Sequence, residues 1–274
     1  MRFGKYPGPG GPGALTIAGS DAGGGAGIQA DLKTFAAHGV HGLCAITALT
    51  AQHTRGVTAV HVPPGDFLRA QIDACYEDFD IGAVKLGMLA NDAVIDAVVE
   101  ALQRHRPAQV VLDPVMVATS GAKLLADSAL DAMRTRLLPL ASLITPNLPE
   151  AELLLGHAIA DTDAMRAAAA ELLALGARAV LLKGGHMGGD GPMVDVFADA
   201  QGLRMLTHDR LQLEAHGTGC SLASAVAANL CRGHTMHEAC SAATDYVHRA
   251  LVMGYRPGRG DVVVLDHFGA APAR

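Results

Sequence analysis

Val110-Val111-Leu112 is an unbroken apolar run, and Val180-Leu181-Leu182 repeats the pattern further along the chain. Such runs are typical of central strands that are buried on both faces of a sheet. Other predicted strands are Ala14–Ala18, Leu43–Leu49, Val57–Val62, Val84–Gly87 and Ser142–Thr145. The predicted helices are Ile28–Ala37, Phe67–Tyr76, Asp92–His105, Ser128–Leu138, Glu150–Leu155 and Ala164–Leu175. Because strands and helices alternate, we expect an α/β fold with a mostly parallel central sheet and helices on both faces.

The last third of the chain departs from this alternation. Met193–Ala198, Arg204–Thr207 and Arg210–Leu213 predict an antiparallel meander at one edge, and Val262–Leu265 is expected to close the sheet. Between them, Thr218–Cys231 and Met236–Val252 predict two long helices. With no internal repeat and no long linker, we expect one domain over residues 14–268. Residues 1–13, rich in Gly and Pro, predict a flexible N-terminal tail, and residues 269–274 a C-terminal tail.

Composition excludes several classes of function. The net charge is −6 and no cluster of Lys and Arg occurs, which argues against a nucleic-acid partner. No apolar run reaches the roughly 18–20 residues of a membrane span. The five cysteines are odd in number and form no C-x-x-C pair, a pattern that favours a reducing cytosol. We therefore expect a cytoplasmic protein that binds neither nucleic acid nor membrane.

His216-Gly217-Thr218-Gly219-Cys220 is the stretch with the most specific chemistry. It precedes an Ala-rich helical pattern, so its glycines let unpaired N–H groups gather at the positive end of a helix. That arrangement binds phosphate, and the same field lowers the pKa of a thiol such as Cys220. A glycine-bearing loop packed before a core helix is the structural alternative.

A second glycine-rich loop, residues 19–27, follows the first strand. Within it, Gly25-Ala26-Gly27-Ile28-Gln29-Ala30 fits the G-x-G-x-x-A form of the dinucleotide fingerprint, which indicates an NAD(P)-binding oxidoreductase or another nucleotide-binding module. The acid expected about 20 residues later is missing. Arg55 could instead suit a 2′-phosphate, so this alternative stays open.

Polar residues also follow several other predicted strands. Asp113, Asn147, Glu150 and Lys183 stand at positions that meet at one edge of a parallel sheet. Asp113 could be a turn residue, and Asn147 with Glu150 could be a capping box. Together, an Asp, a Glu and a Lys near anion-binding loops suit Mg²⁺ and a polyphosphate.

Several blocks of the sequence resemble the hydroxymethylpyrimidine/phosphomethylpyrimidine kinases. They occur in the order of that family between about Ala14 and Phe268. The blocks are residues 14–21, 26–35, 46–52, 85–89, 112–116, 143–151, 183–186 and 216–220. The resemblance implies a three-layer ribokinase-like fold, ATP with Mg²⁺, and phosphorylation of 4-amino-5-hydroxymethyl-2-methylpyrimidine and of its monophosphate in thiamine biosynthesis. It also implies that the early glycine loop covers the pyrimidine rather than a dinucleotide, and that the enzyme is a homodimer.

The resemblance carries roles to individual residues. Asp31 and Gln52 match the pair that holds the pyrimidine, and the rest of that pocket would be Gly19, Ala26, Thr50, Met88 and Val115. Asp113 and Glu150 match the residues that organise Mg²⁺, while Asn147 and Lys183 would approach the ATP phosphates. Gly217, Thr218, Gly219 and Cys220 would form the anion hole, with Cys220 in the place of the aspartate base of most ribokinase relatives. A pyridoxal/pyridoxine kinase of the same fold, or dual activity, remains the alternative.

Overall fold

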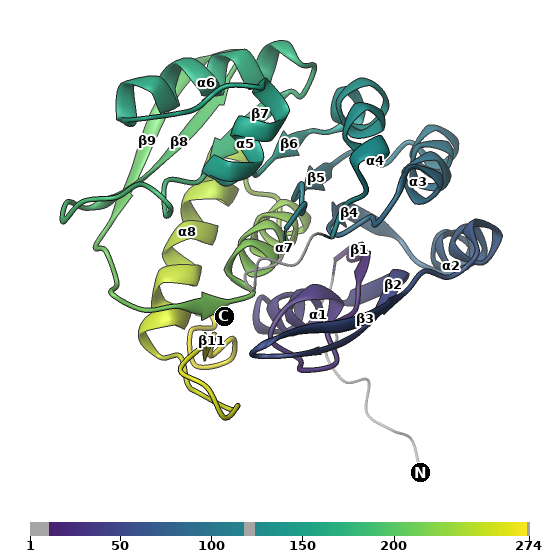
Figure 1. The fold of residues 1–274 in the computed structure, drawn as a ribbon. Coiled ribbons are helices and arrows are strands. Elements are labelled where there is room, and N and C mark those ends of the chain that lie inside the picture. The colour runs from purple at the N-terminus through teal and green to yellow at the C-terminus, as the bar shows by residue number, and fades with distance from the viewer. Residues whose placement is uncertain (1–10, 118–123, 273–274) are drawn as a thin grey trace.

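The computed structural model describes residues 11–117 and 124–272 (Figure 1). The strands are β1 (Gly13–Gly19), β2 (Gly42–His53), β3 (Gly56–His61), β4 (Ile81–Leu86), β5 (Val110–Leu112), β6 (Leu143–Ile144), β7 (Ala179–Leu182), β8 (Met193–Asp199), β9 (Gly202–His208), β10 (Ala215–His216) and β11 (Val263–Val264). The α-helices are α1 (Gly27–Ala37), α2 (Gly65–Asp78), α3 (Asp92–His105), α4 (Asp127–Ala132), α5 (Leu148–Leu155), α6 (Thr162–Ala174), α7 (Thr218–Cys231) and α8 (Met236–Val252).

Nine strands of the described residues form one sheet in the order β3-β2-β1-β4-β5-β6-β7-β8-β9. The pairs from β2 to β7 are parallel, while β3, β8 and β9 pair antiparallel. The predicted α/β class and its mostly parallel sheet are therefore confirmed. The carboxyl ends of β1, β4, β5, β6 and β7 meet at one edge, which is where ligands bind in such sheets.

The helices cover both faces of the sheet and create two separate cores. Figure 1 shows α1, α7 and α8 on one side of the sheet, and α2 to α6 on the other. Alternate strand residues serve the two cores, because successive side chains of a strand point to opposite faces. In β5, for example, Val110 and Leu112 pack with the α2–α6 layer and Val111 packs with the α1–α7–α8 layer.

Three predicted elements differ from the structure. The predicted helix Ser128–Leu138 is divided into α4, a π-helical turn over Met133–Leu137 and a 3-10 turn over Leu138–Leu140, where Pro139 has no N–H to donate. The predicted strand Arg210–Leu213 is wrong, because this segment has no strand partner and runs along a cavity instead.

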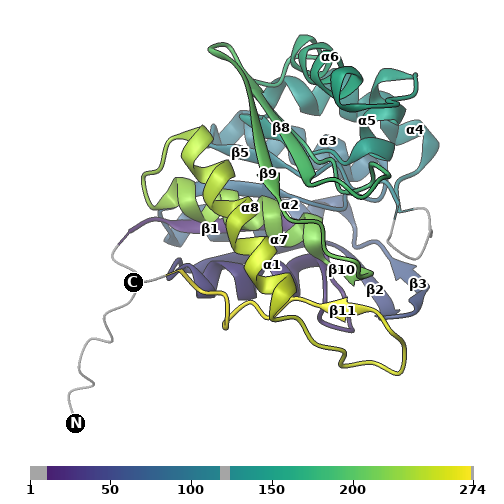
Figure 2. The ribbon, with the colours of Figure 1, turned by 90° about the vertical axis from the view of Figure 1, so that its left-hand side faces the viewer.

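The strand at Val262–Leu265 does not close the main sheet. Its core, β11, pairs in parallel with β10 in a separate two-stranded sheet (Figure 2). The N–H of Val263 donates to the carbonyl of Glu214 at 3.0 Å, a usual distance for a backbone hydrogen bond. This small sheet holds the segment that leads into α7.

The predicted tails differ from the structure at their inner ends. Gly13, assigned to the N-terminal tail, begins β1, and the rest of that tail up to residue 10 lies outside the described residues. Ala270, assigned to the C-terminal tail, is only 2% exposed and packs in the core beside α8. Residues 273–274 of that tail also lie outside the described residues. None of the helices in the described part of the chain is long and apolar enough to cross a membrane.

Candidate active site

The loop before α7 is built as a helix start with free N–H groups. Gly217 is the N-cap with φ 81°, a left-handed conformation that favours glycine. A Cβ at this position would overlap the carbonyl oxygen of Gly25, so the two glycine loops touch. The N–H of Ser221 makes a helical bond to the carbonyl of Gly217 at 2.9 Å. The N–H groups of residues 218–220 precede it and have no carbonyl one turn back, so they form the positive end of the helix.

Lys183 and Asp113 lie directly over this helix start. A Cβ on Gly219 would lie 3.0 Å from Nζ of Lys183 and 3.4 Å from Oδ2 of Asp113. The two charged groups form an ion pair, with Nζ of Lys183 3.1 Å from Oδ1 of Asp113. Thr145 donates its hydroxyl to the same oxygen at 3.3 Å. Glycine at position 219 therefore leaves room for an ammonium group and a carboxylate next to the start of α7.

Asn147 and Glu150 form a capping box at the start of α5. The backbone N–H of Glu150 donates to Oδ1 of Asn147 at 2.9 Å, and that of Asn147 donates to Oε2 of Glu150 at 2.8 Å. Both residues also line the cavity, so the capping role and a ligand-facing role coexist. Burial raises the pKa of Glu150, as does the nearby carboxylate of Asp113, while Lys183 lowers it. The result is a pKa of about 7.

The thiol of Cys220 has a higher pKa than the sequence led us to expect. Burial raises it most, and the carboxylates of Asp113 and Asp31 raise it further. The ammonium of Lys85 lowers it, but the pKa still reaches about 11. The predicted fall in this pKa is therefore wrong for the protein without ligands, because desolvation and the carboxylates of Asp113 and Asp31 outweigh the helix start.

Asp31, predicted to hold the pyrimidine, is not among the residues that line the cavity. Its side chain is fully buried and pairs with Nζ of Lys85 at 3.0 Å. The hydroxyls of Thr16 and Ser224 donate to its two oxygens at 2.6 and 2.7 Å. Both carboxylate oxygens are thus committed to protein groups, and Asp31 acts beneath the site. Lys85, which has no predicted role, does line the cavity.

Gln52 belongs to a hydrogen-bonded chain that joins the two glycine loops. The structure places Nε2 of Gln52 2.9 Å from Nε2 of His216, and Oε1 of Gln52 3.1 Å from the hydroxyl oxygen of Thr50. Nε2 of His216 is also 3.3 Å from Oδ2 of Asp21. Thr50 itself is not among the residues that line the cavity, and its hydroxyl donates to the carbonyl of Ser20 at 2.8 Å.

One cavity of about 610 Å³ brings most of the predicted residues together. Its lining includes Gly19, Ala26, Gln52, Met88, Val115, Asp113, Asn147, Glu150, Lys183, Gly217, Thr218, Gly219 and Cys220. The residues that the sequence did not single out include Lys85, Asp21 and His216. Lys85 and His216 stand inside sequence blocks that were already conspicuous. Their partners are far away in the chain, so no local pattern assigned them a role.

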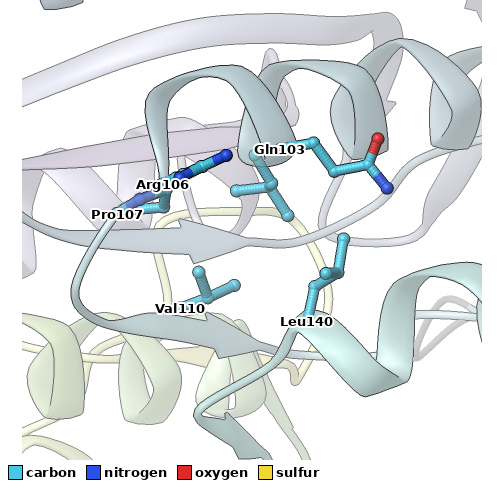
Figure 3. Close-up of a pocket in the computed structure, with 6 residues that line it drawn as sticks. Gln103, Arg106, Pro107, Val110 and Leu140 are labelled. Atoms are coloured by element: carbon cyan, nitrogen blue, oxygen red, sulfur yellow. The ribbon is translucent and has the colours of Figure 1, made fainter.

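A second hollow of about 530 Å³ lies at the opposite edge of the sheet (Figure 3). It is lined by Leu102, Gln103, Arg106, Pro107, Val110 and Leu140. Val110 is the first residue of β5, so this hollow is at the amino end of the strand. Among these six residues Arg106 is the one charged side chain, and the set offers no carboxylate or nucleophile. The hollow therefore has no side chain that could act as a general base or as a nucleophile.

A helix start with free N–H groups, next to a lysine and two carboxylates, is suited to hold and transfer a phosphoryl group. Combined with the three-layer fold, it defines a small-molecule kinase of the ribokinase-like class. Comparisons with known proteins identify the family. The family model described as phosphomethylpyrimidine kinase matches residues 21–265, and the chain belongs to that family. Kinases of this family use ATP.

Individual proteins show the same similarity. The hydroxymethylpyrimidine/phosphomethylpyrimidine kinase of Rhizobium meliloti is 50% identical, over 91% of this chain and 95% of its own length. The thiamine biosynthesis bifunctional protein ThiED of Geobacter sulfurreducens is 47% identical, over 90% of this chain and 50% of its own length. Among solved structures, the ADP complex of Bacillus subtilis pyridoxal kinase is 34% identical, covers 93% of this chain and 97% of that chain, and has a TM-score of 0.85.

The family assignment replaces the NAD(P) alternative. Gly25 and Gly27 do fit the fingerprint, but they serve other contacts. A Cβ at Gly27 would overlap the carbonyl of Gly19, and one at Gly25 would lie 2.9 Å from Cδ2 of His216. The early glycine loop is therefore packed closely against itself and against the loop before α7.

Proposed function

We propose that this protein transfers the γ-phosphoryl group of ATP to 4-amino-5-hydroxymethyl-2-methylpyrimidine, and then a second one to the monophosphate, in thiamine biosynthesis. The observation that carries the proposal is the position of the Lys183 and Asp113 side chains beside Gly219, in the first turn of α7. This helix start lines the same cavity as Gln52. The names of the relatives from Rhizobium meliloti and Geobacter sulfurreducens supply the substrate and the pathway.

The cavity offers a polar and an apolar part for such a substrate. Gln52 would hydrogen-bond the edge of the pyrimidine, with Met88, Val115, Ala26 and Gly19 around the ring. Asn147 and Lys183 would contact the phosphates of ATP. The N–H groups of Thr218, Gly219 and Cys220 would bind the phosphoryl group that moves, because they are the positive end of α7.

Asp113 and Glu150 fit a magnesium ion that is carried by ATP. Within residues 11–117 and 124–272, no group of three or more His, Cys, Asp or Glu side chains is placed to hold a metal ion. One or two carboxylates plus substrate phosphates are what Mg²⁺ usually takes, rather than a cage of protein ligands. Burial, and to a smaller extent the carboxylate of Asp113, raises the pKa of Glu150, and a cation beside the two carboxylates would favour their charged forms. When bound, Mg²⁺ would neutralise charge on the phosphate oxygens.

The reaction needs positioning more than covalent chemistry. The hydroxymethyl oxygen attacks the γ-phosphorus in line, a P–O bond forms, and the bond to the ADP oxygen breaks with its electron pair. Lys183 and the start of α7 stabilise the charge on the transferred group. The hydroxyl proton passes to Sγ of Cys220 when this residue is a thiolate.

The direct test is a product assay. The protein is incubated with ATP and Mg²⁺ and with the hydroxymethylpyrimidine, its monophosphate or pyridoxal in turn, and products are weighed by mass spectrometry. We expect one added phosphoryl group on each pyrimidine. Pyridoxal is included because a pyridoxal kinase shares the fold at a TM-score of 0.85. Phosphorylation of pyridoxal alone would replace the pyrimidine assignment, and no product from any acceptor would remove both.

We further propose that the enzyme is a cytoplasmic homodimer. All five cysteines are free thiols, which suits a reducing compartment. The antiparallel pair β2–β3 ends the sheet with a strand whose residues are all exposed or half-buried. Leu49 and Val60 are 46% and 45% exposed on this pair, and an open edge with apolar side chains favours pairing with another chain.

A further inference from the structure

We propose that His216 is a positioning residue for the pyrimidine: its Nε2–H, shared between Asp21 and Gln52, fixes which end of the Gln52 amide faces the substrate. This orientation exchanges the two ends of the amide relative to the structure, so that the carboxamide oxygen of Gln52 faces His216 and its NH₂ group faces Thr50. The inference rests on the proposed function for the identity of the substrate. The position of the hydrogen on His216 can be tested without it.

Asp21 stands at one end of this hydrogen-bonded chain, and its backbone partners are all donors. Oδ1 accepts from the N–H of Gly23 at 2.8 Å, and Oδ2 accepts from the N–H groups of Gly25 and Ala26 at 2.9 and 2.8 Å. Burial raises the pKa of Asp21, but the hydrogen bonds from His216 and from the Ala26 and Gly23 backbone outweigh it, so the pKa lies below its ordinary value. Asp21 is therefore a carboxylate that can only accept hydrogen bonds.

This carboxylate decides the state of the neighbouring imidazole nitrogen. Nε2 of His216 lies 3.3 Å from Oδ2 of Asp21, and the two side chains are only 12% and 2% exposed. If Nε2 carried no hydrogen, its lone pair would face an anionic oxygen with little water to separate them. Nε2 must therefore carry a hydrogen, and His216 is a donor at this position.

A donor at Nε2 in turn fixes the amide of Gln52. The end of the amide that lies 2.9 Å from Nε2 has to accept, and of the two amide ends only the oxygen can do so. The two ends have nearly the same shape, so the partners decide the orientation. The oxygen therefore faces His216, and the nitrogen faces the hydroxyl of Thr50.

Thr50 independently agrees with this orientation. Its hydroxyl oxygen lies 2.8 Å from the carbonyl oxygen of Ser20 and 3.1 Å from the amide of Gln52. A carbonyl can only accept, so the single hydroxyl hydrogen goes to Ser20. The hydroxyl oxygen is then free to accept from the NH₂ of Gln52. Each contact in the chain Asp21–His216–Gln52–Thr50–Ser20 then joins a donor to an acceptor, with the Nε2–H of His216 shared between Asp21 and Gln52.

The orientation has a consequence for specificity. One hydrogen of the Gln52 NH₂ and one lone pair of its oxygen remain for a ligand. A 4-aminopyrimidine has a ring nitrogen that accepts next to an amine that donates, so its edge can pair with both. Because His216 also begins the loop that leads to Gly217, the residue that orients the ring is continuous with the anion hole.

The position of the hydrogen can be measured by nuclear magnetic resonance. The protein is labelled with ¹⁵N-histidine and studied at about pH 8, above the usual imidazole pKa. The His216 signals are identified by their loss in His216→Gln. We expect Nε2 to show the shift and one-bond proton coupling of an N–H nitrogen. A bare Nε2, with the hydrogen on Nδ1, would overturn the proposal whatever the substrate is.

Kinetics then test whether His216 acts through Gln52. We expect His216→Leu to lower kcat/KM for the pyrimidine about tenfold, the loss of roughly one hydrogen bond, and to change the KM for ATP by less than about twofold. His216→Gln, which can place an N–H at a similar reach, should recover most of the loss. In a Gln52→Leu background, His216→Leu should have no further effect.

Two outcomes would contradict the positioning role. One is an equal tenfold loss in the Gln52→Leu background, which would mean that His216 acts independently of residue 52. The other is an equal rise in the KM for ATP, which would assign the effect to the phosphate loop. His53→Leu is the matched control, because His53 is an exposed histidine one residue from Gln52 and should leave both parameters unchanged. If the unmodified protein fails to phosphorylate the pyrimidine, the proposed function fails while the resonance measurement still decides the orientation.

Discussion

Cys220 lies among groups that act on its thiol in opposite directions. Burial and the carboxylates of Asp113 and Asp31 favour the neutral thiol, while the ammonium of Lys85 favours the thiolate. The neutral form prevails, with a pKa of about 11. A base at this position is therefore mostly protonated at neutral pH in the protein without ligands.

This predicts a rate that rises with pH. Because the pKa is raised, the thiolate fraction grows about tenfold for each pH unit below it, and kcat should increase from about pH 7 toward pH 10. A pH–rate profile at saturating substrates measures this. Cys220→Ser should lower kcat at every pH. A Cys220→Ser enzyme with full turnover would exclude Cys220 as the base while leaving the anion hole in place.

Asp31 shows what the sequence could not reveal at this scale. A carboxylate in a helix after a glycine loop fits a ligand contact as well as a buried pair. What distinguishes them is Lys85, 54 residues away, together with the hydroxyls of Thr16 and Ser224. By contrast, the roles expected of Asn147 and Glu150 in a cap depend on residues only three apart, and that local pattern was readable.

At the scale of single elements, the two ends of α7 allow a matched test of the anion loop. Gly217 before the helix and Gly233 after it both have positive φ, 81° and 88°. A Cβ at Gly217 would overlap the carbonyl of Gly25, whereas a Cβ at Gly233 would meet nothing within 4 Å. The two positions share backbone strain and differ in the contact between the loops.

We expect Gly217→Ala to lower kcat/KM by at least about a hundredfold, because the loop must shift by more than the tolerance of a positioned site. Gly233→Ala should cost about 1 kcal/mol of stability and keep the activity. Steady-state kinetics and denaturant unfolding separate the two effects. Equal activity losses in both variants would show that strain alone, and not the contact with Gly25, is responsible.

The start of α5 combines stability and chemistry in Glu150. This carboxyl group is buried, and its pKa is raised from 4.5 to about 7. The folded state therefore binds the proton more tightly than the unfolded state. The stability that this contributes is present below about pH 4.5 and is lost as the pH rises through 7.

Glu150→Gln should accordingly stabilise the protein without ligands at about pH 8, by roughly 1–3 kcal/mol, and have little effect at about pH 5. Gln preserves the capping box, so the change tests the buried charge. Thermal unfolding at the two pH values measures it, with the exposed Glu77→Gln as control. Activity should fall at the same time, and more Mg²⁺ should restore part of it. A stability gain that is equal at both pH values would contradict the pKa argument.

For the whole molecule, the order of strands and helices was largely predictable. Unalternated runs such as Val180–Leu182 marked the central strands, since burial on both faces leaves a strong compositional signal. Arg210–Leu213 shows the limit: its residues resemble a strand, but the sheet already ends at β9. Likewise, β11 pairs with β10 rather than with the main sheet, a choice set by tertiary packing and not by local propensity.

The exposed edge strand β3 leads to a prediction of the oligomeric state. We expect sedimentation to give twice the chain mass, and the pair Leu49→Glu with Val60→Glu to give the single-chain mass at the same concentration. Like charges introduced on an open edge oppose strand pairing and apolar contact. A wild-type chain that sediments as a monomer over the micromolar range would remove the homodimer proposal, as would a dimer that survives both substitutions.

The contact between the two glycine loops determines when a newly made chain can first form its pocket. Gln52 and His216 are 164 residues apart, and Gly25 meets its partner Gly217 only after β9 has been made. While the chain leaves the ribosome, its first half can form β1, β2 and α1, yet it has nothing against which to close the ring pocket. Competence to bind a nucleotide and a vitamin precursor therefore arrives late in translation. A chain broken before α7 would neither consume ATP nor sequester the precursor.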